Sequence, residues 1–544
     1  MNAAKRDVRN KQGMTFVSGR SMTTGARYAW WLAIVSMAFL PLSFAVGCGD
    51  DSGGGNNQGK DASVDASGTH DSGHNDDAQV QQDGGGADGS VQDAGMHEWN
   101  PDDFAHVYEV GPGHEYADPN EVPWESLPTD SLVLIYWRSA PYRSKWVINT
   151  EGTQDAPVVV LGVPDSGRLP KISGQDATTR QELDYWNENR SVIKVGGSSL
   201  PDENRVPSYV YIQGLDISGA RPPYSFTGHS GSVATYSENA AAVHVEIGDH
   251  ITIEGCEIHD AGNGIFTGWT GSHIVIRANH IFDNGIEDSQ YAHNNYTESL
   301  GILFEYNHFG PLRSGCRGTN LKDRSAGTVI RYNWIESGNR QLDLVESDHA
   351  ELRQDPSYRT TFVYGNILVE PDEADNSQIL HYGGDGGDTS IYRKGTLHFY
   401  NNTVISMRSG NTTLLALSTN DEHCDVRNNV VMATAGSGLL AIVDAKGTVE
   451  LRRNWLQAGW VDTHNGTLEG TVQDLDNLTG TDPLFVDAAN SDYRPASGSP
   501  CIDAAGPLAD AAVQYPVTEE YVLHQNGKTR SDDGSLDIGA FGAQ

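Results

Sequence analysis

The eight residues TVIRYNWI, from Thr328 to Ile335, carry the pattern that decides the fold. An apolar residue stands three positions before Asn333, and another stands two positions after it. Both features recur in nine segments: VYIQGLDI, ITIEGCEI, IVIRANHI, ILFEYNHF, TVIRYNWI, TFVYGNIL, LHFYNNTV, CDVRNNVV and VELRRNWL. Their anchors are Leu215, Cys256, Asn279, Asn307, Asn333, Asn366, Asn402, Asn429 and Asn454. All eighteen flanking positions are apolar, and seven of the nine anchors are asparagine.

The alternation inside each segment is typical of β-strands, and the segments are rich in β-branched and aromatic residues. A coil of three short parallel strands would bury the apolar positions in one continuous core. An asparagine at a fixed turn can adopt the left-handed conformation and bond its amide to the next coil. We therefore predict an all-β fold, a parallel β-helix with an asparagine ladder, with an all-β sandwich as the alternative.

With these repeats the chain resembles the pectate-lyase-like superfamily of right-handed parallel β-helices, over residues 150–500. GTQDAPVVVLGVPDSGRLPKISG (152–174) resembles the first coil of such proteins. DPLFVDAANSDYRPASGSPCIDAA (482–505) and the final DIGAFGAQ resemble their closing segment. The resemblance implies an N-terminal cap and first coil over 97–175, the β-helix over 176–480, and a C-terminal coil and cap over 481–544.

The N-terminal region has the layout of a secretory signal. Arg27 precedes an apolar run, and small residues then lead to Cys48. This end resembles a bacterial lipobox, which implies a signal peptide over 1–48, a lipid on Cys48 and a location in the cell envelope, at the outer membrane or cell surface. A single membrane-spanning anchor is the alternative. Residues 49–96 are rich in Asp, Gly and Ser and predict a disordered tether.

Composition limits the partners and the role of cysteine. The formal net charge of -37 argues against nucleic acid as a partner, and we expect a monomer. Beyond Cys48, the four cysteines are widely spaced and contain no CxxC pair, so neither a zinc pattern nor a disulfide framework is indicated. Cys256 and Cys424 fall on repeat positions and are predicted to be core thiols.

One stretch departs from the acidic character of the chain. Residues 313–340 hold six basic residues but only two acids, Asp323 and Glu336. The basic residues are Arg313, Arg317, Lys322, Arg324, Arg331 and Arg340. A local positive excess in so acidic a chain predicts an anionic partner, and we favour a uronate-containing polysaccharide.

Strand alternation predicts which side chains face outward here. In NLKDR (320–324), Leu321 should point inward, so Asn320 and Lys322 should point outward. In the next coil Gln341 and Asp343 should face outward, and in the following one Gln378, with Ile379 inward. One coil earlier, Tyr296 takes the place of Lys322, with Asn294 beside it.

Cleavage of a uronate chain by β-elimination needs positive charge at the carboxylate, a base near C5 and an acid for the leaving oxygen. Neighbouring cations would depress the pKa of Lys322 and suit it to be the base, while Tyr296 or His293 would be the acid. The pattern resembles β-helical lyases of alginate and dermatan-type chains, which implies Lys322 as base and Arg340 as its partner. The predicted substrate-binding residues are Arg324, Asn320, Gln341, Asp343, Arg317, Asn294 and His381.

Calcium remains open as a cofactor. The resembling lyases place acidic calcium ligands just before the lysine, whereas residues 313–321 contain no acid, so Arg317 or Arg324 would take the place of the ion. Asp343 and Glu346 are the candidate ligands. The sequence GGDGGD (383–388) is either a calcium turn or a glycine-rich insertion.

Several functions share these features. A glycoside hydrolase would need two or three outward carboxylates, and Asp343 is the main one near Lys322. A C5-epimerase would use similar groups. A non-catalytic adhesin would bind the glycan without turnover. Lys322 and Asp343 could also be a simple surface ion pair between neighbouring coils.

Overall fold

The computed structural model describes residues 96–372, 376–434, 438–531 and 534–543. The predicted signal peptide with Cys48 and the predicted tether, apart from Met96, lie outside the described residues. Within these described ranges, no helix is both long and apolar enough to cross a membrane.

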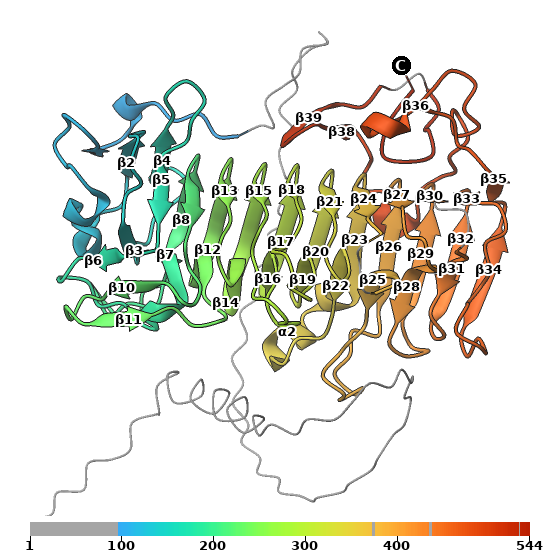
Figure 1. Ribbon diagram of the computed structural model, residues 1–544, viewed down its shortest axis with the longest axis horizontal. Coiled ribbons are helices and arrows are strands. Elements are labelled where there is room, and N and C mark those ends of the chain that lie inside the picture. The colour runs from blue at the N-terminus through green and yellow to red at the C-terminus, as the bar shows by residue number, and fades with distance from the viewer. Residues whose placement is uncertain (1–95, 373–375, 435–437, 532–533, 544) are drawn as a thin grey trace, which may run out of the picture. The chain divides into compact units, whose positions relative to one another are not determined.

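The chain winds into coils whose strands pair in parallel along three columns, here called sheets 1, 2 and 3 (Figure 1). Sheet 1 contains β3 (Ser144–Ile148), β7 (Ser191–Val195), β16 (Asn295–Thr297), β19 (Leu321–Asp323), β22 (Leu342–Leu344), β25 (Gln378–Tyr382), β28 (Thr412–Leu417) and β31 (Leu440–Val443). Two long strands, β12 (Ala241–Glu254) and β14 (Asn263–Arg277), belong to sheet 1 in their first half and to sheet 2 in their second.

The other two sheets follow the same order. Sheet 2 also contains β1 (His106–Val110), β2 (Ser131–Tyr136), β4 (Val158–Val163), β8 (Ser208–Gln213), β17 (Ser299–Glu305), β20 (Ala326–Arg331), β23 (Thr360–Tyr364), β26 (Thr396–Tyr400), β29 (His423–Arg427), β32 (Thr448–Arg452) and β34 (Thr471–Leu475). Sheet 3 contains β5 (Lys171–Ser173), β9 (Asp216–Ser218), β13 (Glu257–Ile258), β15 (His280–Ile281), β18 (His308–Phe309), β21 (Trp334–Glu336), β24 (Ile367–Glu370), β27 (Thr403–Ser406), β30 (Val430–Ala433), β33 (Trp455–Gln457) and β35 (Leu478–Gly480).

The remaining elements are short. They are β6 (Ala177–Thr179), β10 (Ser225–Thr227) and β11 (Val233–Thr235) beside the first coils, the hairpins β36 (Phe485–Asp487) with β37 (Asp492–Pro495) and β38 (Glu519–Val522) with β39 (Asn526–Thr529), and helix α2 (Ala350–Gln354). The 3₁₀ turns are Pro101–Asp103, Pro119–Glu121, Trp124–Ser126, Glu188–Arg190, Pro356–Arg359, Ala488–Asn490 and Asp510–Ala512.

The repeat pattern builds the core as predicted. All eighteen apolar positions that flank the nine anchors are at most 1 % exposed, and they belong to one continuous hydrophobic cluster. Inward-pointing side chains of all three sheets fill this hydrophobic core. Because each coil contacts only its neighbours in the core, the parallel β-helix follows directly from the repeat.

The predicted asparagine ladder is present and joins eight asparagines in seven steps. The Oδ1 of Asn333 accepts hydrogen bonds from the N and Nδ2 of Asn307, at 2.9 Å each, and its Nδ2 donates to the carbonyl of Phe304. The same bonds link Asn279, Asn307, Asn333, Asn366, Asn402, Asn429, Asn454 and Asn477.

One detail of this ladder differs from the prediction. The left-handed residue is the one before each anchor, such as Tyr332 or Asn428, and not the anchor itself. The left-handed bend of the backbone therefore comes one residue before the asparagine, whose side chain is then free to point along the axis of the core.

The C-terminal segment does more than close the last coil. After β35 the chain turns back and its two hairpins lie along the flank of the helix, beside coils formed much earlier (Figure 1). Tyr400 Oη donates to the carbonyl of Tyr515 at 2.8 Å, and Gln525 Nε2 donates to the carbonyl of Ala278 at 3.2 Å. This segment covers apolar and aromatic side chains on the outside of sheets 2 and 3.

Candidate functional site

Sheet 1 carries the candidate site on its outer face. Strands β16, β19, β22 and β25 are in register, so Tyr296, Lys322, Asp343 and His381 follow one another in a single column. The sequence predicted the first three of these positions. The fourth differs, because Leu342 pairs with Leu380 and not with Ile379, and this shift brings His381 into the column.

Lys322 lies at the centre of the site between two carboxylates. Its Nζ donates to Asp343 Oδ2 at 2.6 Å and to Asp385 Oδ2. Burial acts to lower the pKa of Lys322, but the charges of Asp343 and Asp385 outweigh it, and the pKa is raised. The expectation that neighbouring cations depress this pKa is therefore wrong for this arrangement, because the nearest charges are negative.

Asp385 was not predicted, and it connects the two central cations. Its other oxygen, Oδ1, accepts from Arg324 Nη2 at 3.0 Å, so one carboxylate bridges Lys322 and Arg324. The Arg324 Nε also donates to the Tyr296 hydroxyl at 3.1 Å. The signal that could have found Asp385 was the GGDGGD sequence, which places two carboxylates, Asp385 and Asp388, among glycines.

A network of hydrogen bonds holds the loop that carries Asp385. Asp343 Oδ1 lies 2.7 Å from His381 Nδ1, and His381 Nε2 lies 2.8 Å from Ser418 Oγ. Ser418 Oγ accepts from the backbone N–H of Gly384, next to Asp385. A Cβ at Gly384 would overlap the ring of Tyr392, so the close approach of this loop requires glycine.

Glu346 holds the same loop through hydrogen bonds to its backbone. Its carboxylate accepts from the backbone N–H of Asp385 at 2.9 Å and of Gly386 at 2.6 Å, and it is fully buried. Asp343 is 3 % exposed and already contacts Lys322 and His381. Both predicted calcium ligands are thus occupied by groups of the protein.

Three predicted substrate-binding residues do not point outward from sheet 1. Asn294, Asn320 and Gln341 are fully buried. Asn294 Nδ2 donates to Asn320 Oδ1 at 3.0 Å, and Gln341 Nε2 donates to the Glu370 carboxylate, so these amides satisfy buried groups at the turn between sheets 3 and 1. The prediction was wrong because each residue precedes its strand, where the inward and outward alternation has not yet begun.

Other basic residues of the stretch meet acids from distant parts of the sequence. Arg313 Nη2 lies 2.6 Å from Asp260, and Arg331 Nη2 lies 2.6 Å from Glu305. The local positive excess in the sequence is therefore largely balanced in space.

The remaining predicted cations lie at the edge of the column. Arg340 donates twice to Gln378 Oε1, at 2.9 and 2.6 Å, and its Nη1 lies 3.8 Å from Asp343. Arg317 is exposed in the loop before β19, outside the column.

His293 lies behind the column and is 3 % exposed. Its Nδ1 accepts the backbone N–H of Thr319 at 3.0 Å. Burial, with the nearby charge of Lys322, lowers the pKa of His293 to about 3. The ring is neutral at physiological pH, which argues against the predicted role of His293 as the acid.

Glu298 is a second titratable group that the sequence did not reveal. It follows β16, and its carboxylate accepts from Ser347 Oγ at 2.5 Å. Burial raises the pKa of Glu298 to about 7, against the opposing effects of Ser347 and Arg324. A carboxyl group with this pKa can exchange protons near neutral pH.

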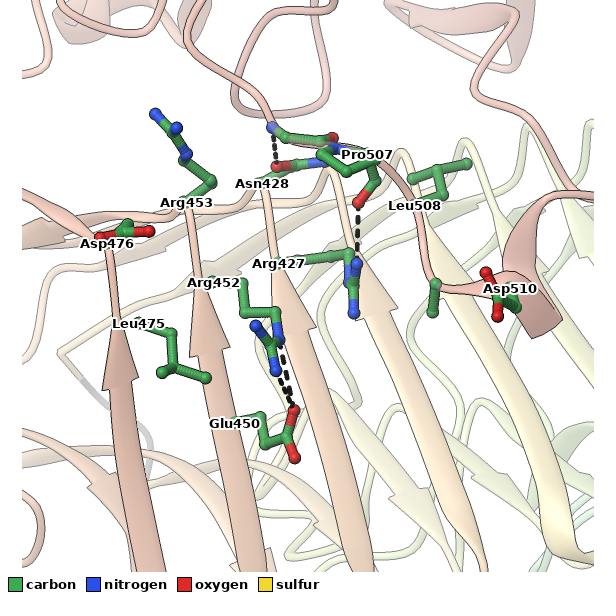
Figure 2. A pocket seen from close by; sticks show the side chains of 12 residues that line it. Arg427, Asn428, Glu450, Arg452, Arg453, Leu475, Asp476, Pro507, Leu508 and Asp510 are labelled. Atoms are coloured by element: carbon green, nitrogen blue, oxygen red, sulfur yellow. Dashed lines mark hydrogen bonds and ion pairs between the residues drawn. The ribbon is translucent and has the colours of Figure 1, made fainter.

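A separate hollow lies on the flank of sheet 2, away from this column (Figure 2). There Arg427 Nη1 donates to the carbonyl of Pro507 at 2.7 Å, and Asn428 Oδ1 accepts from the N–H of Gly506. Arg452 is paired with Glu450 on the same strand, β32. Arg427 and Asn428 fasten the returning C-terminal segment, and we assign the hollow a structural role.

The comparisons with known proteins concern the fold. Residues 226–355 match a family model described as a right-handed beta helix region. The chain folds as a right-handed parallel β-helix. No curated protein matches the sequence.

Solved structures similar to this β-helix include three carbohydrate-active enzymes. Pectate lyase Pel9A is 12% identical with a TM-score of 0.44, covering 81% of this chain and 97% of that one. An alginate lyase from Paenibacillus sp. str. FPU-7 is 11% identical with a TM-score of 0.41, covering 63% and 99%. DFA-IIIase from Arthrobacter chlorophenolicus A6 is 13% identical with a TM-score of 0.33, covering 59% and 83%. Similarity at this level carries no information about the reaction.

Proposed function

We propose that this protein is an enzyme that cleaves a uronate-containing polysaccharide by β-elimination at the Lys322–Arg324 site. The supporting observation is the bridging position of Asp385, whose carboxylate contacts both cations. A site that already holds a carboxylate of the protein has the charge and geometry to hold a uronate carboxylate. The signal sequence extends the proposal to an enzyme lipid-anchored in the bacterial cell envelope.

The roles follow from the contacts. Lys322 and Arg324 bind the substrate carboxylate after Asp385 leaves, and their charge stabilises the electron density that moves onto it when the C5 proton is removed. Tyr296, whose hydroxyl contacts Arg324, transfers protons at C5 or at the leaving oxygen. Lys322 can act as the base predicted from the sequence only in its neutral form, after Asp385 has left, and Arg324 alone then supplies the positive charge at the carboxylate.

A retaining glycoside hydrolase is the second candidate. Asp343 and Asp385 both contact Lys322 Nζ, so their nearest oxygens lie no more than about 5 Å apart. This limit fits the short carboxylate spacing of retaining enzymes, about 5–5.5 Å, better than the longer spacing of inverting ones. However, one of the two must be protonated to act as the acid. Burial opposes ionisation, yet Lys322 and the other nearby cations lower the pKa of both, which favours the lyase.

The test is incubation of the protein with alginate, pectate, chondroitin, dermatan and heparan chains. A lyase produces unsaturated uronate, which absorbs in the ultraviolet, and Lys322→Ala should abolish the signal. Lys394→Ala is the matched control, because Lys394 pairs with Asp421 outside the site. New reducing ends without absorbance would indicate the hydrolase, inverted C5 configuration would indicate the epimerase, and binding without product would indicate the adhesin.

A further inference from the structure

A cluster of two histidines and one aspartate lies where β12 and β14 pass from sheet 1 to sheet 2. Asp249 Oδ2 lies 2.9 Å from His250 Nδ1, and Asp249 Oδ1 lies 2.7 Å from His273 Nδ1. One ligand atom from each residue lies within 4.8 Å of the others. It is the only such group of three or more His, Cys, Asp or Glu side chains in the described part of the chain.

The backbone fixes this arrangement. The registers of the flanking residues place Tyr209, His250 and His273 on the same turn position of three successive coils. All three adopt the left-handed conformation, with φ of 49°, 54° and 50°. Their rings form one stack, with centroids 4.5 and 4.3 Å apart. The two imidazoles are therefore held in place by the coils and not by side-chain packing alone.

The carboxylate is also held. Ser272, which pairs with Asp249 across the rungs, donates its hydroxyl to Asp249 Oδ1 at 2.6 Å. Such a hydrogen bond to a ligating carboxylate is the usual outer support of a metal site. The side chains are 35 % to 57 % exposed, so a further coordination position faces solvent.

We propose that Asp249, His250 and His273 form a binding site for a divalent transition-metal ion, with zinc as the ion tested. Two imidazole nitrogens and one carboxylate oxygen suit zinc, copper or nickel and are a poor set for calcium, which prefers oxygen ligands. In tetrahedral coordination the ligand atoms lie about 3.3 Å apart, so the two contacts of Asp249 with the histidines, at 2.9 and 2.7 Å, need to lengthen by about half an ångström. The ion would tie together two adjacent coils.

The experiment is calorimetric titration of the protein with zinc chloride, comparing wild type with His250→Asn, His273→Asn and His229→Asn. Asparagine tolerates the left-handed conformation of the two positions but removes the imidazole. His229 is the control, because its Nδ1 contacts a single carboxylate, Glu188, at 3.2 Å. Comparison of variants is needed because the chain holds 19 histidines.

We expect His250→Asn and His273→Asn each to lose one zinc equivalent that wild type and His229→Asn retain, with a zinc-dependent rise in melting temperature lost in parallel. Equal zinc stoichiometry and affinity in all four proteins would overturn the proposal. If a variant fails to fold, the wild type is tested instead. Zinc should then protect His250 and His273 from modification by diethylpyrocarbonate, as measured by mass spectrometry. Unprotected modification at both positions would also overturn it.

Discussion

Replacing Asp385 by asparagine removes the negative charge that bridges Lys322 and Arg324 but keeps the size of the side chain. In the wild type a uronate carboxylate must displace Asp385 before it reaches the two cations. The apparent affinity is then the intrinsic affinity multiplied by the fraction of molecules in which Asp385 has left the two cations. We therefore expect Asp385→Asn to bind uronate chains more tightly than the wild type.

The magnitude follows from the two contacts. Hydrogen bonds to charged groups are worth about 1.5–3 kcal/mol each when buried. The Asp385 side chain is 36 % exposed, which reduces the value of its ion pairs, and about 1–2 kcal/mol in total is a reasonable estimate. This corresponds to a decrease of about 5- to 30-fold in Kd or KM for the uronate substrate.

The assay is calorimetric binding of glucuronate and galacturonate oligosaccharides, together with kcat and KM on the cleaved chain. Asp388→Asn is the matched control, because Asp388 lies in the same loop, is exposed, and its side chain accepts hydrogen bonds from the neighbouring Ser390. Unchanged or weaker binding by Asp385→Asn would refute the displacement argument. A fall of about 100-fold in kcat with unchanged binding would instead identify Asp385 as a catalytic carboxylate.

Three further predictions concern the site and its scaffold. Arg324→Lys keeps the charge but loses the planar fork, so KM should rise about tenfold while the melting temperature changes little; an unchanged KM would remove Arg324 from carboxylate binding. The pKa of His293 is lowered to about 3, from about 6.5 in the unfolded chain. As the pH falls, His293 is therefore protonated in the unfolded chain before it is protonated in the folded protein. The free energy of unfolding is highest above pH 6.5 and decreases as the pH falls toward 3. This loss should reach about 3 kcal/mol at pH 4 in wild type and be absent in His293→Asn, measured by urea unfolding at pH 7 and pH 4. Asn333→Ala leaves the N–H groups of Asn307 without their acceptor, so urea unfolding should show a loss of about 2–4 kcal/mol, whereas Asn465→Ala, in an exposed loop, should be nearly neutral.

The sequence was sufficient for the core because the repeat encodes it locally. Each anchor and its two apolar neighbours lie within six residues, so the strand, the turn and the buried positions can be read together. Asn477 escaped this reading because Asp474 and Thr479 replace its apolar neighbours. The ladder nevertheless includes it, because the amide and not the apolar neighbours makes the bonds.

The site was less predictable because its charges come from distant coils. Lys322 and Asp343 could be aligned by counting from the anchors, but Asp385 reaches them from a loop 63 residues after Lys322. Counting also failed at the ends of strands, as Asn320 and Gln341 show. The sign of the pKa shift of Lys322 depends on these distant acids, so the local sequence predicted it incorrectly.

The returning C-terminal segment affects both the folding and the unfolding of this protein. A β-helix alone can add coils one after another as the chain leaves the ribosome, with each coil needing only its predecessor. Here Tyr306 Oη contacts Glu519, 213 residues later, and Gln525 reaches back to Ala278. Residues synthesised more than 200 positions later thus join coils formed early, and the loop closure involved is slow. Once in place, the segment resists fraying of the middle coils and should make unfolding more cooperative than in an open repeat array.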